Sequence, residues 1–265
     1  MQDPSYPIHH YAPLIAGANV IKIECLSSEN FLNNLNTTLT SQKVKAVLVS
    51  FPHNPTTLTV NQEFYDELVK LARRYNFLII NDFAYSDIYF NEEKPPSLLN
   101  SDPQFDHTVE LYSLTKGYSM AGWRVGFAVG NESAISSLTK LKSYIDYGTF
   151  QPIQIASTVA LNELDDYPFE LSTVYKERRE LVQEYLDDLD FIVQESDATM
   201  FVWAKLPKTF NKDSLKFSLD ILEKSNVAIS PGIGFGKFGE GHIRIALVEN
   251  KQRIRQAMKN IKAAL

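Results

Sequence analysis

The sequence predicts an α/β fold, and three observations support this prediction. Near-continuous apolar runs, typical of buried parallel strands, recur through the first part of the chain. Amphipathic segments of helical length separate several of these runs. Later the rhythm changes to long helices and short strands, which is typical of an α+β unit. We therefore expect a mostly parallel sheet with helices on both faces, followed by a smaller α+β domain.

Five apolar runs of the first part are expected to be strands: 20–26, 45–51, 77–83, 108–114 and 124–130. The clearest helix between them is expected over 61–76, where apolar residues recur at spacings of three and four and therefore share one face. These residues are Phe64, Leu68, Leu71 and Tyr75. A helix between apolar strands is what a parallel sheet requires for its crossover connections.

The later part of the chain is expected to be richer in helix. Helices are expected over 132–146, 152–164, 167–189, 213–225 and about 250–265. Short strands are expected within 191–196, 199–206, 227–232 and 242–248. We place a domain boundary near residue 165, so that 1–165 form a partial large domain and 166–265 form a C-terminal small domain.

Composition narrows the classes of partner. The chain has 265 residues, of which 44% are hydrophobic and 22% charged, with a net charge of -6. This acidic balance gives no general field for nucleic acid or an anionic membrane. No apolar run is long enough for a transmembrane helix. We expect small-molecule substrates and other protein chains as partners, with no nucleic acid and no membrane.

Cysteine and histidine usage argues against a disulfide or a metal site. Cys25 is the single cysteine of the sequence, which excludes an internal disulfide and favours a reducing, cytoplasmic setting. The five histidines show no metal-ligand spacing and have no CxxC partner. We therefore expect no metal.

Polar side chains follow three of the expected strands. Asn54 follows the strand at 45–51, Asp82 ends the next strand with Tyr85 shortly after it, and Ser113 and Lys116 follow the strand at 108–114. In an open α/β sheet, ligands bind where the carboxyl ends of the strands converge. These positions are the candidate site.

Lys116 is the candidate nucleophile. An amine held among apolar neighbours is costly to protonate, so its pKa falls and it attacks carbonyls more readily. The alternative is a lysine whose ammonium reaches solvent while its stem packs against apolar surface. The side chains around the candidate site favour the first interpretation, because each meets a need of pyridoxal 5'-phosphate (PLP).

A ring that acts as an electron sink needs a carboxylate beside its nitrogen, and Asp82 could supply it. The alternative is that Asp82 caps a short helix that begins near Ser86. Asn54 and Tyr85 could donate to the phenolic oxygen of the ring, or they could be ordinary turn and packing residues. A phosphate needs a fixed cation and hydroxyls, which Arg124 and Ser113 could provide.

Several motifs, taken together, carry a family resemblance. The segment SLTKGYSMAGWRVGF closely resembles the lysine segment of the class I and II aminotransferases, which are fold type I PLP enzymes. The motifs DPSYP, NPTT, NDFAYSD, SPGIGFG and HIRIAL stand in the order that this family has. Within the family, KSYIDYGTFQP, VYKERRE and WAKLP look most like the bacterial alanine (glutamate-pyruvate) aminotransferases. The LL-diaminopimelate aminotransferases are close neighbours.

The resemblance implies a catalytic role for three residues. Lys116 would bond covalently to PLP and later move the proton between the substrate Cα and the cofactor C4'. Asp82 would pair with the pyridine nitrogen. Tyr85, together with Asn54, would hold the phenolic oxygen, and Tyr6 would stack on the face of the ring.

The resemblance also implies how phosphate and substrate are held. Ser113 and Arg124 would bind the cofactor phosphate, while Arg244, with Asn54, would bind the substrate α-carboxylate. The implied activity is a ping-pong transfer of an amino group between an amino acid of the alanine or glutamate type and a 2-oxo acid. The family resemblance further implies a homodimer.

Two departures from the family pattern leave alternatives open. Thr57 stands where the family usually has glycine, which costs little if this residue avoids a positive φ. The chain also lacks the N-terminal segment that family members carry before DPSYP, of about a hundred residues or more, close to the size of a small domain. The alternatives are therefore a truncated, catalytically impaired remnant, an LL-diaminopimelate aminotransferase, or a PLP-dependent carbon–sulfur lyase on the same scaffold.

Overall fold

The computed structural model describes residues 1–210 and 213–265. They form two compact units, and each unit is discontinuous in sequence. Unit 1 comprises Met1–Asn34, His53–Leu58 and Thr173–Leu265, and unit 2 comprises Leu35–Pro52 and Thr59–Ser172. The division of the chain into domains 1–165 and 166–265 stays a prediction.

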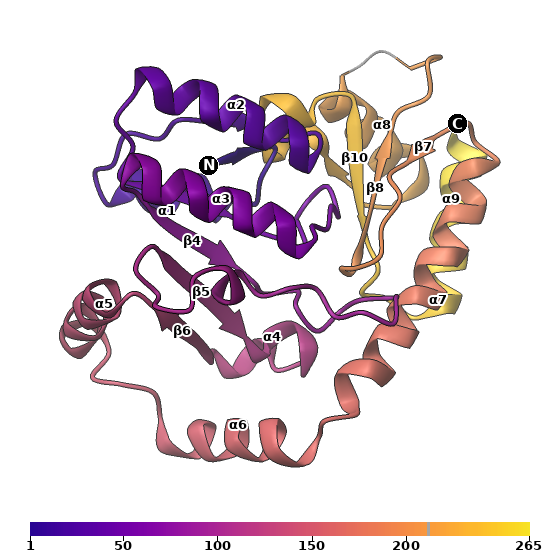
Figure 1. Cartoon of the computed structure of the whole chain (residues 1–265). Coiled ribbons are helices and arrows are strands. Elements are labelled where there is room, and N and C mark those ends of the chain that lie inside the picture. The colour runs from indigo at the N-terminus through magenta and orange to yellow at the C-terminus, as the bar shows by residue number, and fades with distance from the viewer. Residues whose placement is uncertain (211–212) are drawn as a thin grey trace. The chain divides into compact units, whose positions relative to one another are not determined.

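Unit 2 is built on a four-stranded sheet with the order β3-β4-β5-β6 (Figure 1). Its strands are β3 (Ala46–Val49), β4 (Leu78–Asp82), β5 (Thr108–Ser113) and β6 (Gly126–Gly130). The first three are parallel, and β6 runs antiparallel to β5. The predicted mostly parallel α/β sheet is confirmed, with an antiparallel strand at one edge.

The expected strand at 20–26 is wrong in extent and in partner. It is reduced to β2 (Ile23–Glu24), which lies in unit 1 and pairs in parallel with β1 (Gln2–Asp3). A two-stranded pair of this length satisfies few backbone groups, so the apolar alternation of this segment overstated its strand length.

Helix α3 (Gln62–Tyr75) matches the expected helix at 61–76. Asn61 caps its N-terminus by accepting a hydrogen bond from the Phe64 amide at 3.2 Å, and Asn76 ends it in the left-handed conformation. Phe64 and Leu68 are buried, as the apolar spacing predicts. The helix therefore forms where capping residues and the apolar face agree.

The other helices of unit 2 follow the strands in sequence. They are the short 3-10 turns η1 (Leu98–Ser101) and η2 (Ala121–Trp123), and the helices α4 (Leu114–Gly117), α5 (Glu132–Ile145) and α6 (Gln151–Glu163). Helices α5 and α6 confirm the expected helices at 132–146 and 152–164. Of these, α4 is important for function because it contains Lys116.

Unit 1 contains a second four-stranded sheet with the order β7-β8-β10-β9. Its strands are β7 (Ile192–Val193), β8 (Phe201–Lys205), β9 (Ser230–Pro231) and β10 (His242–Ala246), and every pairing is antiparallel. Figure 1 shows β8 and β10 side by side. All four strands lie within the segments that the sequence predicts.

Helices cover this second sheet and complete its core. They are α8 (Ser214–Ser225) and α9 (Lys251–Ala264), with the 3-10 turns η3 (Gly232–Phe235) and η4 (Lys237–Gly239). The core buries apolar side chains of both helices and of the strands, including Val202, Phe217, Ile221, Ile243 and Met258. Burial of such side chains is worth about 1.5–3 kcal/mol each, which makes this core the main source of stability of unit 1.

Three further helices complete the described residues. Helix α1 (Pro7–Ile15) belongs to unit 1, whereas the residues of α2 (Ser28–Ser41) and α7 (Tyr167–Asp187) are divided between the units. Helix α7 confirms the expected helix at 167–189. The sequence did not predict α1, which contains Pro13, or α2, which is rich in asparagine and threonine. These residue types have low helix propensity, so tertiary contacts must stabilise both helices.

Candidate active site

Asp82 is the last residue of β4, and its turn fixes it in place. Its Oδ1 accepts a hydrogen bond from the Ala84 amide at 3.2 Å, and its carbonyl accepts one from Ser50 Oγ at 2.9 Å. No helix begins at Ser86, where the chain forms turns. The alternative interpretation, in which Asp82 caps such a helix, is therefore wrong.

Lys116 lies at the carboxyl end of the neighbouring strand. Strands β4 and β5 are parallel, with Asp82 opposite Leu111, so both strands deliver their following residues to the same edge of the sheet. The Nζ atom of Lys116 lies 5.8 Å from the centre of the Tyr85 ring. The structure therefore brings together Lys116 and Tyr85, and places Asp82 at the end of the adjacent strand.

Ser113 and Arg124 lie at the two ends of the α4 and η2 segment. Ser113 Oγ accepts the Thr115 amide at 3.2 Å and donates to the Val125 carbonyl at 3.5 Å. Arg124 is exposed and has a left-handed backbone with φ of 55°. Its Nη1 donates to the Ala121 carbonyl at 2.9 Å, which leaves the outer face of the guanidinium for an anion.

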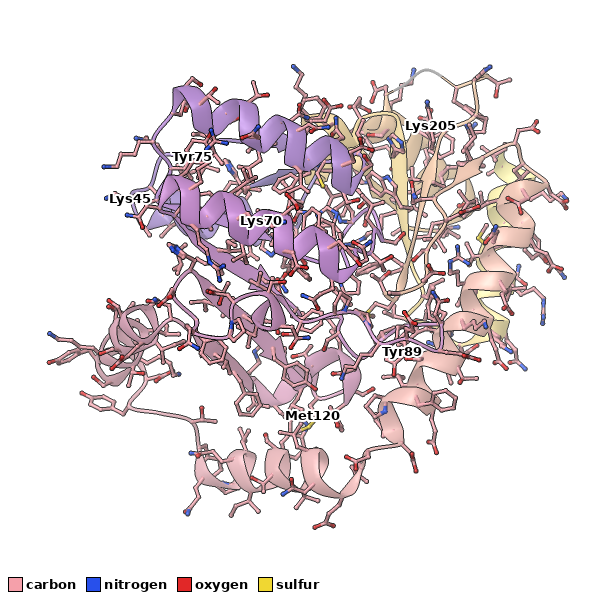
Figure 2. All side chains as sticks on the ribbon, viewed as in Figure 1. Lys45, Lys70, Tyr75, Tyr89, Met120 and Lys205 are labelled. Atoms are coloured by element: carbon pink, nitrogen blue, oxygen red, sulfur yellow. The ribbon has the colours of Figure 1, made fainter. Side chains whose placement is uncertain are left out.

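An apolar cluster packs around the segment 112–125, which contains Lys116. Leu114, Met120 and Ala160 are buried together, and half-buried Tyr112, Tyr118, Val125 and Ala156 pack around them. Figure 2 labels Met120, which follows α4. The cluster fixes the backbone on both sides of Lys116, so its amine projects from an ordered turn.

In unit 1, Arg244 lies between two aromatic rings. Its guanidinium carbon is 4.2 Å from the centre of the Phe201 ring and 4.5 Å from that of Phe235. Nη1 donates to Asn54 Oδ1 at 2.7 Å, and Nη2 lies 3.4 Å from Ser230 Oγ. These contacts fix the orientation of the planar guanidinium, which a pair of parallel hydrogen bonds to a carboxylate requires.

The loop that carries Asn54 is buried and tightly turned. Asn54 precedes a cis proline, and the Thr57 amide donates to the His53 carbonyl at 2.9 Å. Thr57 does not meet the condition for tolerance set above, because its φ is 63°. A β-branched residue in this region costs about 1–2 kcal/mol, and its buried Oγ1 has no hydrogen-bond partner among the described residues. Threonine at this position therefore lowers stability.

Tyr6 presents its ring to solvent at the start of α1. The side chain is 44% exposed, and its ring lies edge to face with that of His9 at 5.9 Å. His9 is in turn held by Ser5, whose Oγ lies 2.8 Å from His9 Nδ1. An exposed aromatic ring on a fixed backbone is suited to stacking on a flat ligand.

Acid should destabilise the folded chain through His53. Burial, with a smaller effect of His9, lowers the pKa of His53 to about 3. The unfolded chain binds this proton below about pH 6.5 and the folded chain does not, so stability falls as the pH falls through that window. We expect a loss of about 2–3 kcal/mol over two pH units. Urea unfolding at several pH values measures it, and His53→Asn should flatten the slope; an unchanged slope in that variant would contradict this origin.

The side chains of unit 2 fit PLP by their chemistry. They comprise an amine, a carboxylate, a phenol, a hydroxyl and a guanidinium, from Lys116, Asp82, Tyr85, Ser113 and Arg124. Hydrogen bonds orient Asp82, Ser113 and Arg124, and the Lys116 amine lies beside the Tyr85 ring. This donor set matches an aldehyde, a ring nitrogen, a phenolic oxygen and a phosphate.

Sequence reasoning missed the residues that orient Arg244. Phe201, Phe235 and Ser230 contact its guanidinium but lie far from it in sequence. The apolar run 199–206 predicted a strand that includes Phe201, and nothing in the sequence linked this residue to Arg244. Only the antiparallel pairing of β8 with β10 brings these two residues together.

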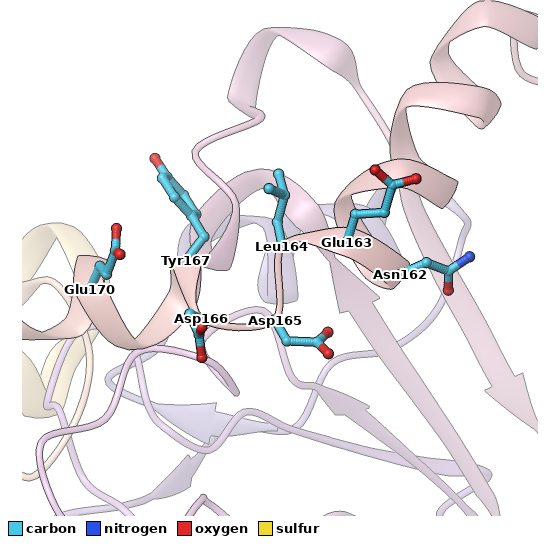
Figure 3. Close-up of a pocket in the computed structure, with 7 residues that line it drawn as sticks. All are labelled: Asn162, Glu163, Leu164, Asp165, Asp166, Tyr167 and Glu170. Atoms are coloured by element: carbon cyan, nitrogen blue, oxygen red, sulfur yellow. The ribbon is translucent and has the colours of Figure 1, made fainter.

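A pocket at the junction of α6 and α7 does not fit the same ligand. It has a volume of about 440 Å³ and is lined by Asn162, Glu163, Leu164, Asp165, Asp166, Tyr167 and Glu170 (Figure 3). Four of these seven residues are acidic, which disfavours an anionic cofactor. The pocket contains no residue of the candidate site.

Residues 1–210 and 213–265 contain neither a metal-binding cluster nor a membrane-spanning helix. No group of histidine, cysteine and acidic side chains in this part of the chain could hold a metal ion. None of the described helices combines the length and the apolar character needed to cross a bilayer.

Comparison with known proteins gives a family match along almost the whole chain. The family model for aminotransferase class I and II matches residues 1–261. The chain is 42% identical to the glutamate-pyruvate aminotransferase AlaC of Escherichia coli strain K12, over 98% of this chain and 64% of that protein. It is 41% identical to an LL-diaminopimelate aminotransferase of Natranaerobius thermophilus, over 98% of this chain and 67% of that protein.

Solved structures agree with this match. The apo-BacF structure from Bacillus subtilis superposes with a TM-score of 0.91 at 31% identity, over the whole of this chain and 68% of that one. The chain spans roughly two thirds of the length of the curated relatives that it matches. It belongs to the class I and II aminotransferase family, whose members use pyridoxal 5'-phosphate.

Proposed function

We propose that the chain acts as a PLP-dependent aminotransferase that moves an amino group between an amino acid and a 2-oxo acid. The observation that carries this proposal is the position of Lys116 on an ordered turn, 5.8 Å from the Tyr85 ring and at the end of the strand beside Asp82. When bound, PLP supplies an aldehyde and a protonated ring that withdraws electrons from the substrate Cα.

Unit 2 supplies the groups that hold and move protons. With PLP bound, Lys116 would hold the cofactor covalently until the amine of the substrate displaces it, and the freed Lys116 amine would then move a proton between the substrate Cα and C4'. The Asp82 carboxylate, fixed by the Ala84 amide, keeps the ring nitrogen protonated. The Tyr85 hydroxyl donates to the phenolic oxygen, and Ser113 and Arg124 bind the phosphate.

Unit 1 supplies the groups that bind substrate and orient the ring. Arg244 binds the α-carboxylate through its two terminal nitrogens, with Asn54 holding the guanidinium at 2.7 Å and contributing to the phenolic oxygen. Tyr6 stacks on the face of the cofactor ring. Such a cofactor would carry the amino group between the two half-reactions, so we expect ping-pong kinetics.

We favour alanine and glutamate, with their 2-oxo acids, as substrates. The glutamate-pyruvate aminotransferase is a relative at 42% identity, which supports this pair. Within the pair, the segment 141–152 has no arginine to bind a distal carboxylate, which favours alanine. LL-diaminopimelate is the second candidate, because an aminotransferase named for it is 41% identical. We place the reaction in the cytoplasm and in a homodimer, in line with a single, buried Cys25 and with the family.

The proposal predicts a covalent adduct on Lys116. The purified chain is incubated with PLP, reduced with borohydride, digested and mapped by mass spectrometry. We expect the pyridoxyl group on Lys116 and not on Lys142, an exposed lysine that pairs with Asp146. An adduct on other lysines, or no adduct in a folded sample, would count against the proposed function.

Turnover with defined substrates tests the choice between the two candidates. The same protein is assayed with alanine or with LL-diaminopimelate, each with 2-oxoglutarate as amino acceptor. We expect the higher kcat/KM with alanine. A higher value with LL-diaminopimelate would transfer the assignment to the second candidate.

A further inference from the structure

Asp87 is a buried carboxylate that has no role in the function proposed above. It is 7% exposed and lies two residues after Tyr85 in the motif NDFAYSD. Its Oδ1 accepts from Lys94 Nζ at 2.8 Å, and its Oδ2 accepts from the Tyr112 hydroxyl at 2.6 Å. Both oxygens are therefore engaged, which fixes the orientation of the side chain.

The main chain of Asp87 is anchored as well. Ser172, near the start of α7, donates from Oγ to the Asp87 carbonyl at 3.0 Å. The same Oγ accepts from the amide of Tyr89, labelled in Figure 2, at 3.3 Å. Asp87 is therefore fixed through both its side chain and its main chain. Residues that pack against it are held in place in turn.

Gly117, the residue after Lys116, packs closely against the side chain of Asp87. A Cβ added to Gly117 would lie 2.8 Å from both Cβ and Oδ2 of Asp87. Gly117 is the last residue of α4, and this close approach of Asp87 leaves no room for a side chain there.

Tyr112 ties the same carboxylate to the strand that leads into α4. It lies on β5, four residues before Lys116, and its ring stacks on that of Phe127 at 6.3 Å between centres. Burial and the hydrogen bond to Asp87 raise the pKa of Tyr112. The hydroxyl therefore keeps its proton at neutral pH and donates to Asp87. Asp87 consequently holds the chain both before and after Lys116.

We propose that Asp87 is a positioning residue that fixes the Lys116 amine, acting through Tyr112 on one side and Gly117 on the other. This inference rests on the proposed function only in taking Lys116 as the catalytic amine. Because a displacement of about 1 Å at a reacting group can cost about a hundredfold in rate, such a support matters for turnover. Lys94 neutralises the carboxylate from the solvent side.

The first test measures the reactivity of the Lys116 amine without any cofactor. The chain is treated with acetic anhydride, and acetylation of each lysine is followed by mass spectrometry. Asp87→Ala removes the support, so the Lys116 segment should open to solvent more often, and we expect acetylation of Lys116 to be about tenfold faster. Tyr112→Phe keeps the ring and removes only the hydroxyl, and it should show the same effect if Asp87→Ala does not fold.

Asp102 provides the matched control. It is also buried in unit 2, and its carboxylate accepts from Arg73, the His107 amide and Thr108. Asp102→Ala should lower stability without changing acetylation of Lys116. If acetylation of Lys116 is the same in wild type, Asp87→Ala and Tyr112→Phe, the positioning role is overturned, whether or not the chain transaminates.

The second test separates positioning from binding. With PLP and alanine, Asp87→Ala should lower kcat by about 10- to 100-fold while KM stays within about twofold. Asp87→Asn keeps an acceptor for Tyr112 and should recover most of the loss. A rise in KM with an unchanged kcat would overturn the proposal. If wild type forms no adduct on Lys116 but Asp87→Ala still speeds its acetylation, the proposed function fails and the positioning role stands.

Discussion

Replacing Lys116 with alanine should lower kcat for amino transfer by about a thousandfold or more. The variant loses both the amine that holds the cofactor and the base that moves the Cα proton. The buried cluster beside the segment is formed by Leu114, Met120 and Ala160, and the substitution leaves these side chains in place. The loss should therefore appear in activity with little change in the free energy of unfolding.

Single-turnover measurements with alanine and PLP-loaded protein check this expectation. Lys142→Ala, which removes an exposed lysine paired with Asp146, should retain full activity. A small primary amine added to Lys116→Ala should restore part of the rate, because it can replace the missing base. Retention of more than about a tenth of the wild-type rate would show that another group moves the proton.

The sheet of unit 2 could be predicted because β3 and most of β4 are apolar and turn-forming residues follow β3. Buried parallel strands such as β4 read as continuous apolar runs, and α3 repeats its apolar face at helical spacing between two asparagine caps. The sequence could not indicate that β2 leaves this sheet, because alternation specifies a strand and not its partner.

Helix α2 shows where local reasoning stops. Its apolar residues Phe31, Leu35 and Leu39 recur every four residues and are buried, yet asparagine and threonine dominate the segment between them. Low propensity concealed the periodicity, and tertiary burial decided the conformation. A count of the apolar spacing alone would have found this helix.

Some residues of the candidate site could be identified from local sequence features, and others could not. Asp82, Tyr85 and Lys116 follow their strands directly, so the carboxyl-end rule identified them. The contact between Arg244 and Asn54 joins residues 190 positions apart, and only the resemblance assigned both to substrate. The left-handed backbone of Thr57 gave no signal in the sequence, since threonine is not a residue that favours it.

Replacing Arg244 with lysine should lower kcat/KM for amino acids by about a hundred- to a thousandfold, which corresponds to about 3–4 kcal/mol. The guanidinium owes its orientation to two ring faces, at 4.2 and 4.5 Å, and to Asn54 Oδ1 at 2.7 Å. An ammonium group has no planar face to stack and no fork to offer a carboxylate. Its strong hydration also makes the site between Phe201 and Phe235 unfavourable for it.

A substrate amine that lacks a carboxylate tests the role of Arg244 in carboxylate binding, because such an amine cannot pair with the guanidinium. The half-reaction with 2-aminopropane should run at nearly the same rate in wild type and Arg244→Lys, whereas the half-reaction with alanine should slow by the full factor. Arg178→Lys is the control, since Arg178 is half-buried in the same unit and donates to the Leu247 carbonyl at 2.8 Å. It should leave both rates unchanged. Equal losses with alanine and with 2-aminopropane in Arg244→Lys would show that Arg244 supports the fold of unit 1 and does not bind the substrate carboxylate.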